Sequence, residues 1–341
     1  MNFEIVRPNT LCNRLVVVDG LPGCGKTMLS AVISSLERVE LFKYSYEIET
    51  QCILHHFDKV DRPTSASMVQ YHLDLIIYNQ MMGRETNFRY SDLSSAFKAV
   101  DRWKYFKRLF GPGDQTVPNL IETQKPIVHL VTHCLSAYAT PLLDNFKDEM
   151  LLINFHRNPL YMLKQNRWNM ENLINSERDF NLYFNWKGKR LPYFFHSQEE
   201  KFLKANPVEK VIYFLEWSRK NAIKNQLSDY GKHYYELTFE SFVSNPFPHL
   251  EEIESRLSTQ KTGLTSGILK REKIPRKVLS HGRDIPIYRR VNWEKTDASS
   301  NDQEIDNLYK WAISEISNQA KAALDWLIED YEKIANRLVN K

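Results

Sequence analysis

A glycine-rich segment near the N-terminus has the residue types and the spacing of a phosphate-binding loop. It reads Gly20-Leu21-Pro22-Gly23-Cys24-Gly25-Lys26-Thr27 and satisfies the pattern G-x-x-x-x-G-K-[ST]. In this pattern the glycines let the backbone turn tightly, so that successive N–H groups point toward phosphate oxygens. Lys26 adds a cation, Thr27 adds a hydroxyl for a metal ion or an oxygen, and the following helix adds its N-terminal dipole. The segment therefore predicts phosphate binding.

Arg157 is the second candidate, in the sequence His156-Arg157-Asn158-Pro159. It follows the apolar run MLLINF at 150–155, which is typical of a strand buried on both faces. Ligands of open parallel sheets bind at the carboxyl ends of the strands, so the fork of donors on this arginine is placed to reach a second phosphate. A structural ion pair and a solvated helix cap remain alternative interpretations.

A carboxylate that would hold magnesium is harder to find. An ATP-dependent enzyme with such a loop normally has a second aspartate or glutamate at the end of an apolar strand. The strands expected at 127–132 and 150–155 are followed by His133 and by His-Arg instead. The nearest carboxylate is Asp58, at the end of the short possible strand ILHHFD. This pattern disfavours ATP-dependent chemistry without excluding it.

These candidate residues need a sheet that brings strand ends together. The apolar run at 15–19 predicts a first strand, and the helical spacing of apolar residues after the glycines predicts a helix. Further strands are expected at 127–132, 150–155 and 233–239, with helical stretches between them. Strands that alternate with helices predict an α/β fold of three layers around a central parallel sheet.

Two helices have clear sequence signals of their own. The sequence Asn206-Pro207-Val208-Glu209 supplies an N-cap, a proline at the first helical position and the glutamate of a capping box. An apolar stripe with a spacing close to 3.6 predicts a long helix near 303–338. We interpret it as a packing helix that covers the sheet, with a partner-binding helix as the alternative.

Two segments interrupt the alternation of strands and helices. Residues 83–120 and 176–205 are rich in aromatic residues, charges and turn formers. Long irregular segments of this kind are often lids or substrate-binding loops. Ordinary surface insertions are the alternative.

Composition narrows the class of protein. The chain has 341 residues, of which 42% are hydrophobic and 26% charged, which excludes collagen-like and wholly disordered classes. The formal net charge of +4 is too small to indicate a nucleic-acid surface. We expect no leader peptide, no membrane span and, from four scattered cysteines without metal or disulfide spacing, a cytoplasmic location.

Four segments together resemble the sulfotransferase family, whose members have the P-loop fold and use 3′-phosphoadenosine 5′-phosphosulfate. In that family the loop grips the 5′-phosphosulfate, a later strand ends in Thr-His, and the next strand ends in an arginine that holds the 3′-phosphate. The order and spacing agree over about 20–250. The resemblance implies one sulfotransferase-like domain over 1–341, with a three-layer fold like that of P-loop NTPases. The matching segments are Pro22 to Met28, Lys125 to His133, Leu151 to Pro159 and Phe239 to Pro246.

The resemblance also implies roles for single residues. Lys26 would stabilise charge on the phosphosulfate, and His133 would be the catalytic base, although carbohydrate-acting members of the family use a glutamate elsewhere. The residues implied to bind the donor are Gly23, Cys24, Gly25, Lys26, Thr27, Met28, Arg157 and Gln165.

The chain departs from the family's pattern at three places. Gly23 stands where the family has an early lysine or arginine, so Lys26 would supply the loop cation. Gln165 stands where the family has a serine. The family's late Arg-Lys-Gly loop has only a loose counterpart in Arg276-Lys277 and His281-Gly282-Arg283.

We therefore expect an enzyme that moves a sulfuryl group to a hydroxyl or amine of a small-molecule or carbohydrate acceptor. The resemblance implies no metal ion. We also expect no nucleic acid and no membrane as partner, and the sequence leaves the oligomeric state open. One alternative is a small-molecule kinase that uses ATP and magnesium. The other is a nucleotide-binding P-loop protein without catalytic activity.

Overall fold

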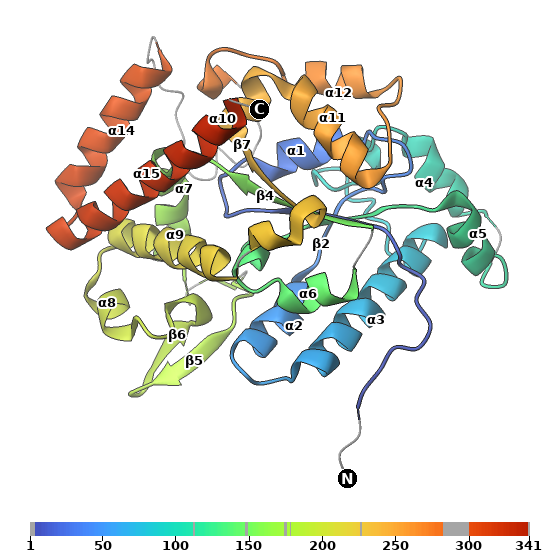
Figure 1. Ribbon diagram of the computed structural model, residues 1–341, viewed down its shortest axis with the longest axis horizontal. Helices are drawn as coiled ribbons and strands as arrows, with labels where there is room; N and C mark the ends of the chain where they lie inside the picture. Colours follow the sequence, from blue (N-terminus) through green and yellow to red (C-terminus); the bar gives the residue numbers. More distant parts are fainter. Residues whose placement is uncertain are drawn as a thin grey trace.

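The core of the molecule is a five-stranded parallel sheet with helices on both faces (Figure 1). The computed structural model describes residues 4–111, 113–146, 149–173, 176–177, 179–225, 227–281 and 300–339. The strands run in the order β2-β3-β1-β4-β7, and every adjacent pair is parallel. Their bounds are β1 Leu15–Asp19, β2 Lys43–Tyr44, β3 Val128–Val131, β4 Met150–His156 and β7 Tyr234–Thr238. The α/β fold with a central parallel sheet is therefore confirmed.

The sequence of β1 explains its place at the centre of the sheet. All five of its residues are buried, because helices cover both faces and leave no side for polar groups. Leu15 pairs with Val128 of β3 on one side and with Met150 of β4 on the other. The loop that follows β1 therefore lies between the carboxyl ends of two neighbouring strands.

The helices form two layers and a peripheral group (Figure 1). Helices α1, α11 and α12 lie on one face of the sheet, and α7, α9 and α15 lie on the other. Helix α3 packs on β3, with α2 and α6 against it. The bounds are α1 Lys26–Ile33, α2 Tyr46–His56, α3 Arg62–Met81, α4 Arg102–Arg108, α5 Val117–Gln124, α6 Thr140–Asn145, α7 Pro159–Glu171, α8 Glu199–Lys204, α9 Pro207–Lys224, α10 Phe239–Ser244, α11 Pro246–Leu257, α12 Thr265–Arg271, α14 Asn301–Glu315 and α15 Asn318–Val339.

The possible strand that ends at Asp58 is wrong. Residues 46–56 form helix α2, and Ile48 and Cys52 are buried at helical spacing. Asp58 lies in the turn after the helix with a φ of 53°, so it follows a helix and not a strand. A short apolar run fits a strand and a buried helical turn equally well, and here tertiary packing selects the helix.

The structure divides the helix expected near 303–338 into α14 and α15. Ile316 is extended, with φ −126° and ψ 156°, and ends α14. The N–H of Ser317 then donates to Glu209 Oε1 at 2.8 Å. Glu209 also completes the capping box of α9 by accepting from Asn206 N at 3.0 Å. One carboxylate therefore fixes both the start of α9 and the bend between the last two helices, and α15 packs on α9 and β7.

The two segments that interrupt the alternation contain short elements. Residues 83–120 include the 3₁₀ turn η1 Ala96–Lys98, helix α4 and the start of α5. Residues 176–205 include the antiparallel hairpin of β5 Tyr183–Trp186 and β6 Lys189–Pro192, followed by η3 Tyr193–Phe195 and α8. Their role as lids or substrate loops remains a prediction. The other 3₁₀ turns are η2 Leu135–Ala137, η4 Leu227–His233 and η5 Leu279–His281.

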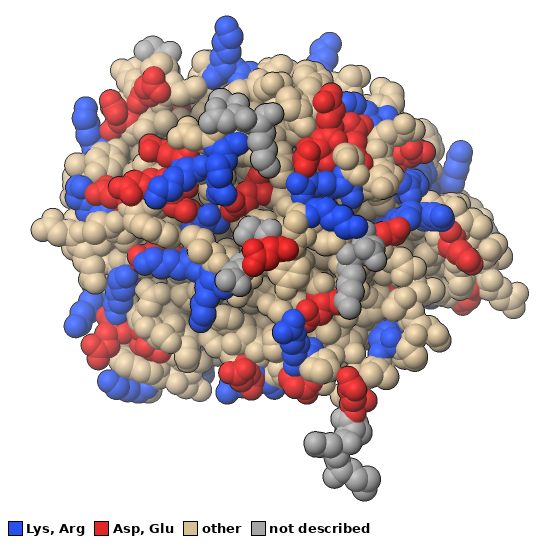
Figure 2. Space-filling model, in the orientation of Figure 1, with Lys and Arg blue, Asp and Glu red and all other residues tan. Residues whose placement is uncertain are grey.

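The surface has no strong bias of charge on the face drawn in Figure 2. Basic and acidic side chains lie interspersed there, in keeping with the small formal net charge of +4. Among the described helices, none has the length and apolar character needed to cross a bilayer.

A buried ion pair near the edge of the sheet gives a testable dependence of stability on pH. Burial alone raises the pKa of Glu40, but Lys104 and Arg108, both at 2.7 Å, lower it to about 2. Because the folded pKa lies below the ordinary value of 4.5, the stabilisation is complete above that value and is lost as the pH falls toward 2. Glu40→Gln should lower the free energy of unfolding at pH 7 by about 3–5 kcal/mol, since it leaves a buried cation unpaired.

Urea unfolding at pH 7 and at pH 3 checks this expectation. The difference between the variant and the wild-type protein should shrink at the lower pH. Glu171→Gln, in the exposed pair with Arg167, is the matched control and should change stability by less than about 1 kcal/mol. An equal difference at both pH values would contradict the role given to Glu40.

Candidate functional site

The predicted phosphate loop has the backbone that its glycines allow. Gly23 and Gly25 have φ values of 90° and 93°, in the left-handed region that side chains rarely adopt. A Cβ on Gly25 would lie 2.5 Å from the ring of Phe239, so this position also requires glycine for space. The loop joins the end of β1 to the start of α1, as the sequence predicts.

The polar side chains of the loop differ in the contacts that they make. Lys26 is buried, and its Nζ donates to the carbonyl oxygen of Gly20 at 2.6 Å, so the cation is held against the loop itself. Thr27 Oγ1 lies 3.1 Å from the hydroxyl of Tyr44 on β2. Burial raises the pKa of the Cys24 thiol, so this cysteine is a neutral packing group and not a nucleophile.

Arg157 lies beside the loop. Its Nη1 donates to the carbonyl oxygen of Gly23 at 2.9 Å, while its Nε is buried without a hydrogen-bond partner. The guanidinium stacks on two rings, 4.4 Å from the centroid of Phe239 and 4.9 Å from that of Tyr161. Gln165 adjoins the same turn, because its Oε1 lies 3.1 Å from the point where a Gly23 Cβ would be.

Arg276 converges on the same ring as Arg157. Its guanidinium lies 5.5 Å from the centroid of Phe239 and also donates to the carbonyl oxygen of Leu279 at 3.1 Å. The late basic segment is thus brought to the loop from a distant part of the chain. Of the other residues of that segment, Gly282 and Arg283 lie outside the described residues.

His133 follows β3 on the other side of the loop and is held by a carboxylate. Glu49 Oε1 accepts from the backbone N–H of His133 at 2.6 Å and lies 3.2 Å from its Nδ1. The imidazole stacks against the rings of Tyr44 and Tyr46, with centroids 5.9 Å and 5.4 Å away. With Nδ1–H donated to Glu49, the lone pair of Nε2 is left to accept a proton.

Several residues of the site were not expected from the sequence, among them Glu49 and Asn166. Glu49 lies on α2, and no motif in the sequence marks it. Asn166 supports the loop from α7 by donating to the carbonyl oxygen of Pro22 at 2.8 Å. The only sequence signal for Asn166 is its position next to Gln165.

Asp19 ends β1 and organises the turn that carries His133. Its Oδ1 accepts from Thr132 Oγ1 at 2.7 Å and from Leu135 N at 2.9 Å, and its Oδ2 accepts from Ser136 N at 2.7 Å. These bonds fix the chain directly after β3. The carboxylate of Asp19, which directly precedes the loop, is therefore occupied by hydrogen bonds to the turn after β3.

The last helix is tied to the turn that carries Arg157. The hydroxyl of Tyr331 on α15 donates to Glu240 Oε2 at 2.6 Å, and Glu240 Oε1 accepts from Asn158 N at 3.2 Å. Burial raises the pKa of Glu240, although the nearby Arg157 acts in the opposite direction. The turn after β4 is thereby fixed by residues from α10 and α15.

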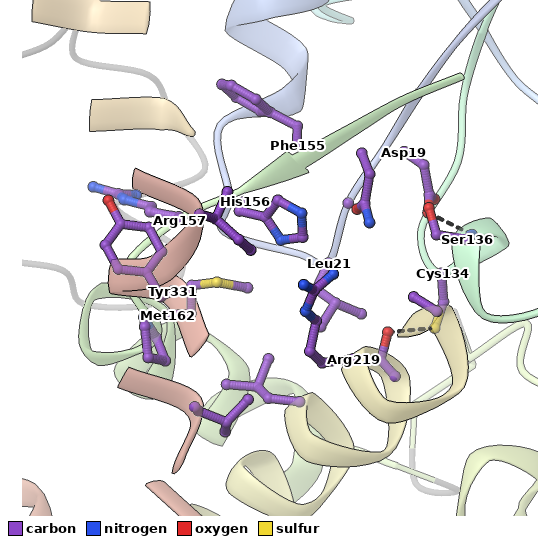
Figure 3. Close-up of a pocket in the computed structure, with 18 of the residues that line it drawn as sticks. Asp19, Leu21, Cys134, Ser136, Phe155, His156, Arg157, Met162, Arg219 and Tyr331 are labelled. Atoms are coloured by element: carbon purple, nitrogen blue, oxygen red, sulfur yellow. Dashed lines mark hydrogen bonds between the residues drawn. The ribbon is translucent and has the colours of Figure 1, made fainter. Parts of the chain in front are cut away.

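A pocket adjoins the loop on the face of the sheet covered by α9 and α15 (Figure 3). It reaches from Asp19 and Leu21 to Tyr331, and Arg219 projects into its centre. Arg219 donates to Glu236 at 2.8 Å and pairs with Asp330 at 2.5 Å. His133, Ser136, Asn154, His156, Arg157, Met162, Leu215 and Leu327 are among the other residues of the lining.

The chain was also compared with known proteins. No family model matches it, and no curated protein matches it. Among solved structures it is similar to the sulfotransferase domain of the Synechococcus PCC 7002 olefin synthase, with 11% identity, a TM-score of 0.41 and coverage of 91% of this chain and 98% of that one. It is also similar to the sulfotransferase domain from the curacin biosynthetic pathway, with 11% identity, a TM-score of 0.44 and coverage of 94% and 97%. A third is mouse sulfotransferase SULT7A1 complexed with PAP, with 11% identity, a TM-score of 0.34 and coverage of 92% and 89%.

Proposed function

We propose that the protein is a sulfotransferase that takes its sulfuryl group from 3′-phosphoadenosine 5′-phosphosulfate. The observation that carries the proposal is the convergence of Arg157 and Arg276 on Phe239, beside the loop that holds Lys26. Two separate cationic centres suit a nucleotide with phosphates at both its 3′ and 5′ positions. A nucleoside triphosphate needs cations along one phosphate chain only.

The proposed reaction is an in-line transfer. The acceptor's oxygen attacks the sulfur, the bond from sulfur to the phosphate oxygen breaks, and the nucleotide leaves as adenosine 3′,5′-bisphosphate. Nε2 of His133 takes the proton of the acceptor hydroxyl, and Lys26 stabilises the charge that develops on the leaving phosphate. Within the proposal, the 5′ end of the nucleotide is surrounded by the loop residues Gly23, Cys24, Gly25, Thr27 and Met28. Gln165 assists Arg157 in binding the 3′-phosphate.

Glu49 gives a prediction for the base. Glu49→Gln should reduce turnover about tenfold or more, since an amide keeps the hydrogen bonds to His133 without the charge that stabilises a protonated imidazole. Affinity for adenosine 3′,5′-bisphosphate should stay within about twofold, because the hydrogen bonds of Glu49 go to His133. Steady-state kinetics and a nucleotide titration measure the two effects. Glu47→Gln, on an exposed position of the same helix, is the control; equal losses in both variants would count against the pairing.

A binding titration with two nucleotides tests the proposed function. Calorimetry should show that adenosine 3′,5′-bisphosphate binds more tightly than ATP with magnesium, and that magnesium leaves the affinity for the bisphosphate unchanged. If ATP binds more tightly and only with magnesium, the sulfotransferase proposal is wrong.

A kinase is the second candidate function, and one observation favours it. The loop satisfies the full pattern G-x-x-x-x-G-K-[ST], with Lys26 and Thr27 at the positions that hold phosphates and magnesium in NTP-dependent enzymes. Against it, β3 is followed by Thr132 and His133, where such an enzyme has a magnesium-binding carboxylate. A nucleotide-binding protein without activity is the third possibility, and any turnover would exclude it.

A further inference from the structure

Helix α4 and the turns on either side of it carry a group of exposed aromatic side chains at the edge of the molecule (Figure 1). Phe110 is 89% exposed, Tyr90 70% and Trp103 63%. The ring of Phe97 lies 5.8 Å from that of Tyr90, and the ring of Phe106 lies 5.4 Å from Phe97 and 5.9 Å from Trp103. We call these five residues the aromatic patch. Contiguous exposed apolar side chains mark a surface that contacts another molecule.

The opposite side of α4 fixes the patch to the rest of the protein. Tyr105 is buried, and its hydroxyl oxygen accepts from the backbone N–H of Leu41 at 2.7 Å. Lys104 and Arg108 reach from the helix to the buried carboxylate of Glu40. The helix is therefore held firmly from one side, and its aromatic residues are left on the surface.

The segment that carries the patch is strongly basic. Residues 83–111 contain seven basic and three acidic residues, so their formal charge of +4 equals that of the whole chain. The acidic side chains are already engaged within the protein. They are Glu85, which pairs with Lys43, Asp92, which pairs with Arg89, and Asp101, whose side chain caps α4.

Three of the seven basic side chains are available to a partner. The other four make ion pairs, whereas Lys98, Arg102 and Lys107 make none with any residue that the structure describes. Nζ of Lys98 lies 4.0 Å from the centroid of Tyr90, and Cζ of Arg102 lies 5.8 Å from that of Trp103. Cations and exposed rings thus share one surface.

A groove beside the patch extends this surface to α12. The groove is lined on one side by Phe97, Lys98 and Arg102. On the other side it is lined by Ile268 and Arg271 of α12, and Nη1 of Arg271 donates to the carbonyl oxygen of Lys98 at 3.2 Å. Basic groups and apolar walls therefore lie together in a hollow where an anionic group with an apolar neighbour fits.

We propose that the aromatic patch, its three unpaired cations and the groove bind the surface of a membrane that contains anionic lipids. Aromatic rings are favoured at the level of the lipid headgroups, and lysine and arginine are attracted to anionic lipid. The expectation of no membrane partner came from the lack of an apolar span in the sequence, and a protein that lies on a membrane needs no span. The proposal is independent of the proposed sulfotransferase activity.

The packing of the rings favours a membrane over single-stranded nucleic acid. Nucleic-acid bases stack on the faces of exposed rings. The planes of Phe97 and Phe106 are inclined by 68°, and those of Tyr90 and Phe97 by 64°, so the patch presents edges and offers no row of parallel faces. A fluid lipid interface accepts rings in any orientation.

Sedimentation with lipid vesicles tests the proposal on the full chain. Vesicles of about one third phosphatidylserine and two thirds phosphatidylcholine should bind the wild-type protein at least about tenfold more tightly than vesicles of phosphatidylcholine alone, because each cation near the surface contributes roughly fivefold. Raising the sodium chloride concentration from about 0.1 M to about 1 M should remove most of this difference, since it shortens the Debye length from about 10 Å to about 3 Å.

Variants assign the binding to this surface. Trp103→Ser and Lys107→Glu should each weaken binding to the anionic vesicles about fivefold or more. The matched controls are Trp168→Ser, at an exposed tryptophan of α7, and Lys204→Glu, at an exposed lysine of α8, and both should bind as the wild-type protein does. All four side chains are exposed, so thermal unfolding should be nearly unchanged.

Tryptophan fluorescence shows whether the patch enters the interface. Brominated phosphatidylcholine in the anionic vesicles should quench part of the fluorescence of the wild-type protein. Trp103→Phe keeps an aromatic ring at this position, so it should still bind within about threefold. That part of the quenching should nevertheless disappear in Trp103→Phe, because the tryptophan that reaches the lipid is gone.

Three results would overturn the inference. The first is equal binding to neutral and anionic vesicles, and the second is an equal effect of Trp103→Ser and Trp168→Ser. The third is displacement of the protein from anionic vesicles by an equal charge concentration of poly-glutamate or of oligo-thymidine, which would assign the surface to an acidic protein or to a nucleic acid. Affinity for adenosine 3′,5′-bisphosphate is measured separately, so failure of the membrane proposal and failure of the sulfotransferase proposal remain distinguishable.

Discussion

Replacing Lys26 with alanine is expected to weaken binding of adenosine 3′,5′-bisphosphate and to lower turnover by more than tenfold. The ammonium is buried at the centre of the loop, where it donates to Gly20 at 2.6 Å. A charge-assisted hydrogen bond in such a place contributes about 1.5–3 kcal/mol. The loss of turnover should exceed the loss of affinity, because charge on the leaving phosphate is greatest in the transition state. Calorimetry and steady-state kinetics measure the two quantities.

Lys204→Ala is the control for this experiment. Lys204 is an exposed lysine of α8 and lies outside the site, so its removal should leave both quantities unchanged. If Lys26→Ala binds the nucleotide as tightly as the wild-type protein and turns over equally fast, the loop does not hold the phosphate.

Replacing Arg157 with lysine is expected to reduce the preference for adenosine 3′,5′-bisphosphate over adenosine 5′-phosphate about tenfold. The guanidinium stacks on Phe239 and Tyr161 while it donates to Gly23. Lysine keeps the charge but has neither the planar group that stacks nor the fork of donors that binds a phosphate through two bonds. Gln165→Ala should act in the same direction and less strongly, since it removes no charge. Parallel titrations with the two nucleotides give the ratio of affinities.

Arg167→Lys, on helix α7 that begins two residues after Arg157, is the matched variant. Arg167 makes a largely exposed ion pair with Glu171, so the ratio of affinities should remain that of the wild-type protein. If the wild-type protein itself shows no preference for the nucleotide with the 3′-phosphate, the sulfotransferase proposal fails and the kinase takes its place.

The parts of the fold that the sequence predicts well are those set by neighbours in the chain. The strand at 15–19, the loop and the start of α1 need only an apolar run, glycines at fixed positions and helical spacing. The capping box at Asn206 and Glu209 is equally local, and its hydrogen bonds are present in the structure. The loop and the arginine were therefore predictable from short patterns.

The parts that the sequence does not predict depend on contacts between distant segments. Glu49 reaches His133 across 84 positions of the chain, and nothing in the sequence of α2 marks it as part of a site. The bend at Ile316 is hidden because the apolar stripe continues from α14 into α15, and the carboxylate that caps α15 comes from Glu209. Tertiary packing determines both features. The periodic spacing of apolar residues in the sequence does not show which distant segments will be in contact.

The position of α15 has a consequence for the order in which the protein is made. The phosphate loop leaves the ribosome about 300 residues before two residues of α15, namely Tyr331, which is tied to Glu240, and Ile334, which lines the pocket. A nascent chain that ends before Asn318 already contains Lys26 and Arg157 but has no wall on that side of the pocket. Contacts between such distant segments form late, because closing long loops is entropically costly. A shortened or stalled chain therefore carries the recognisable motif without a complete site, and only release of the full segment through α15 finishes it.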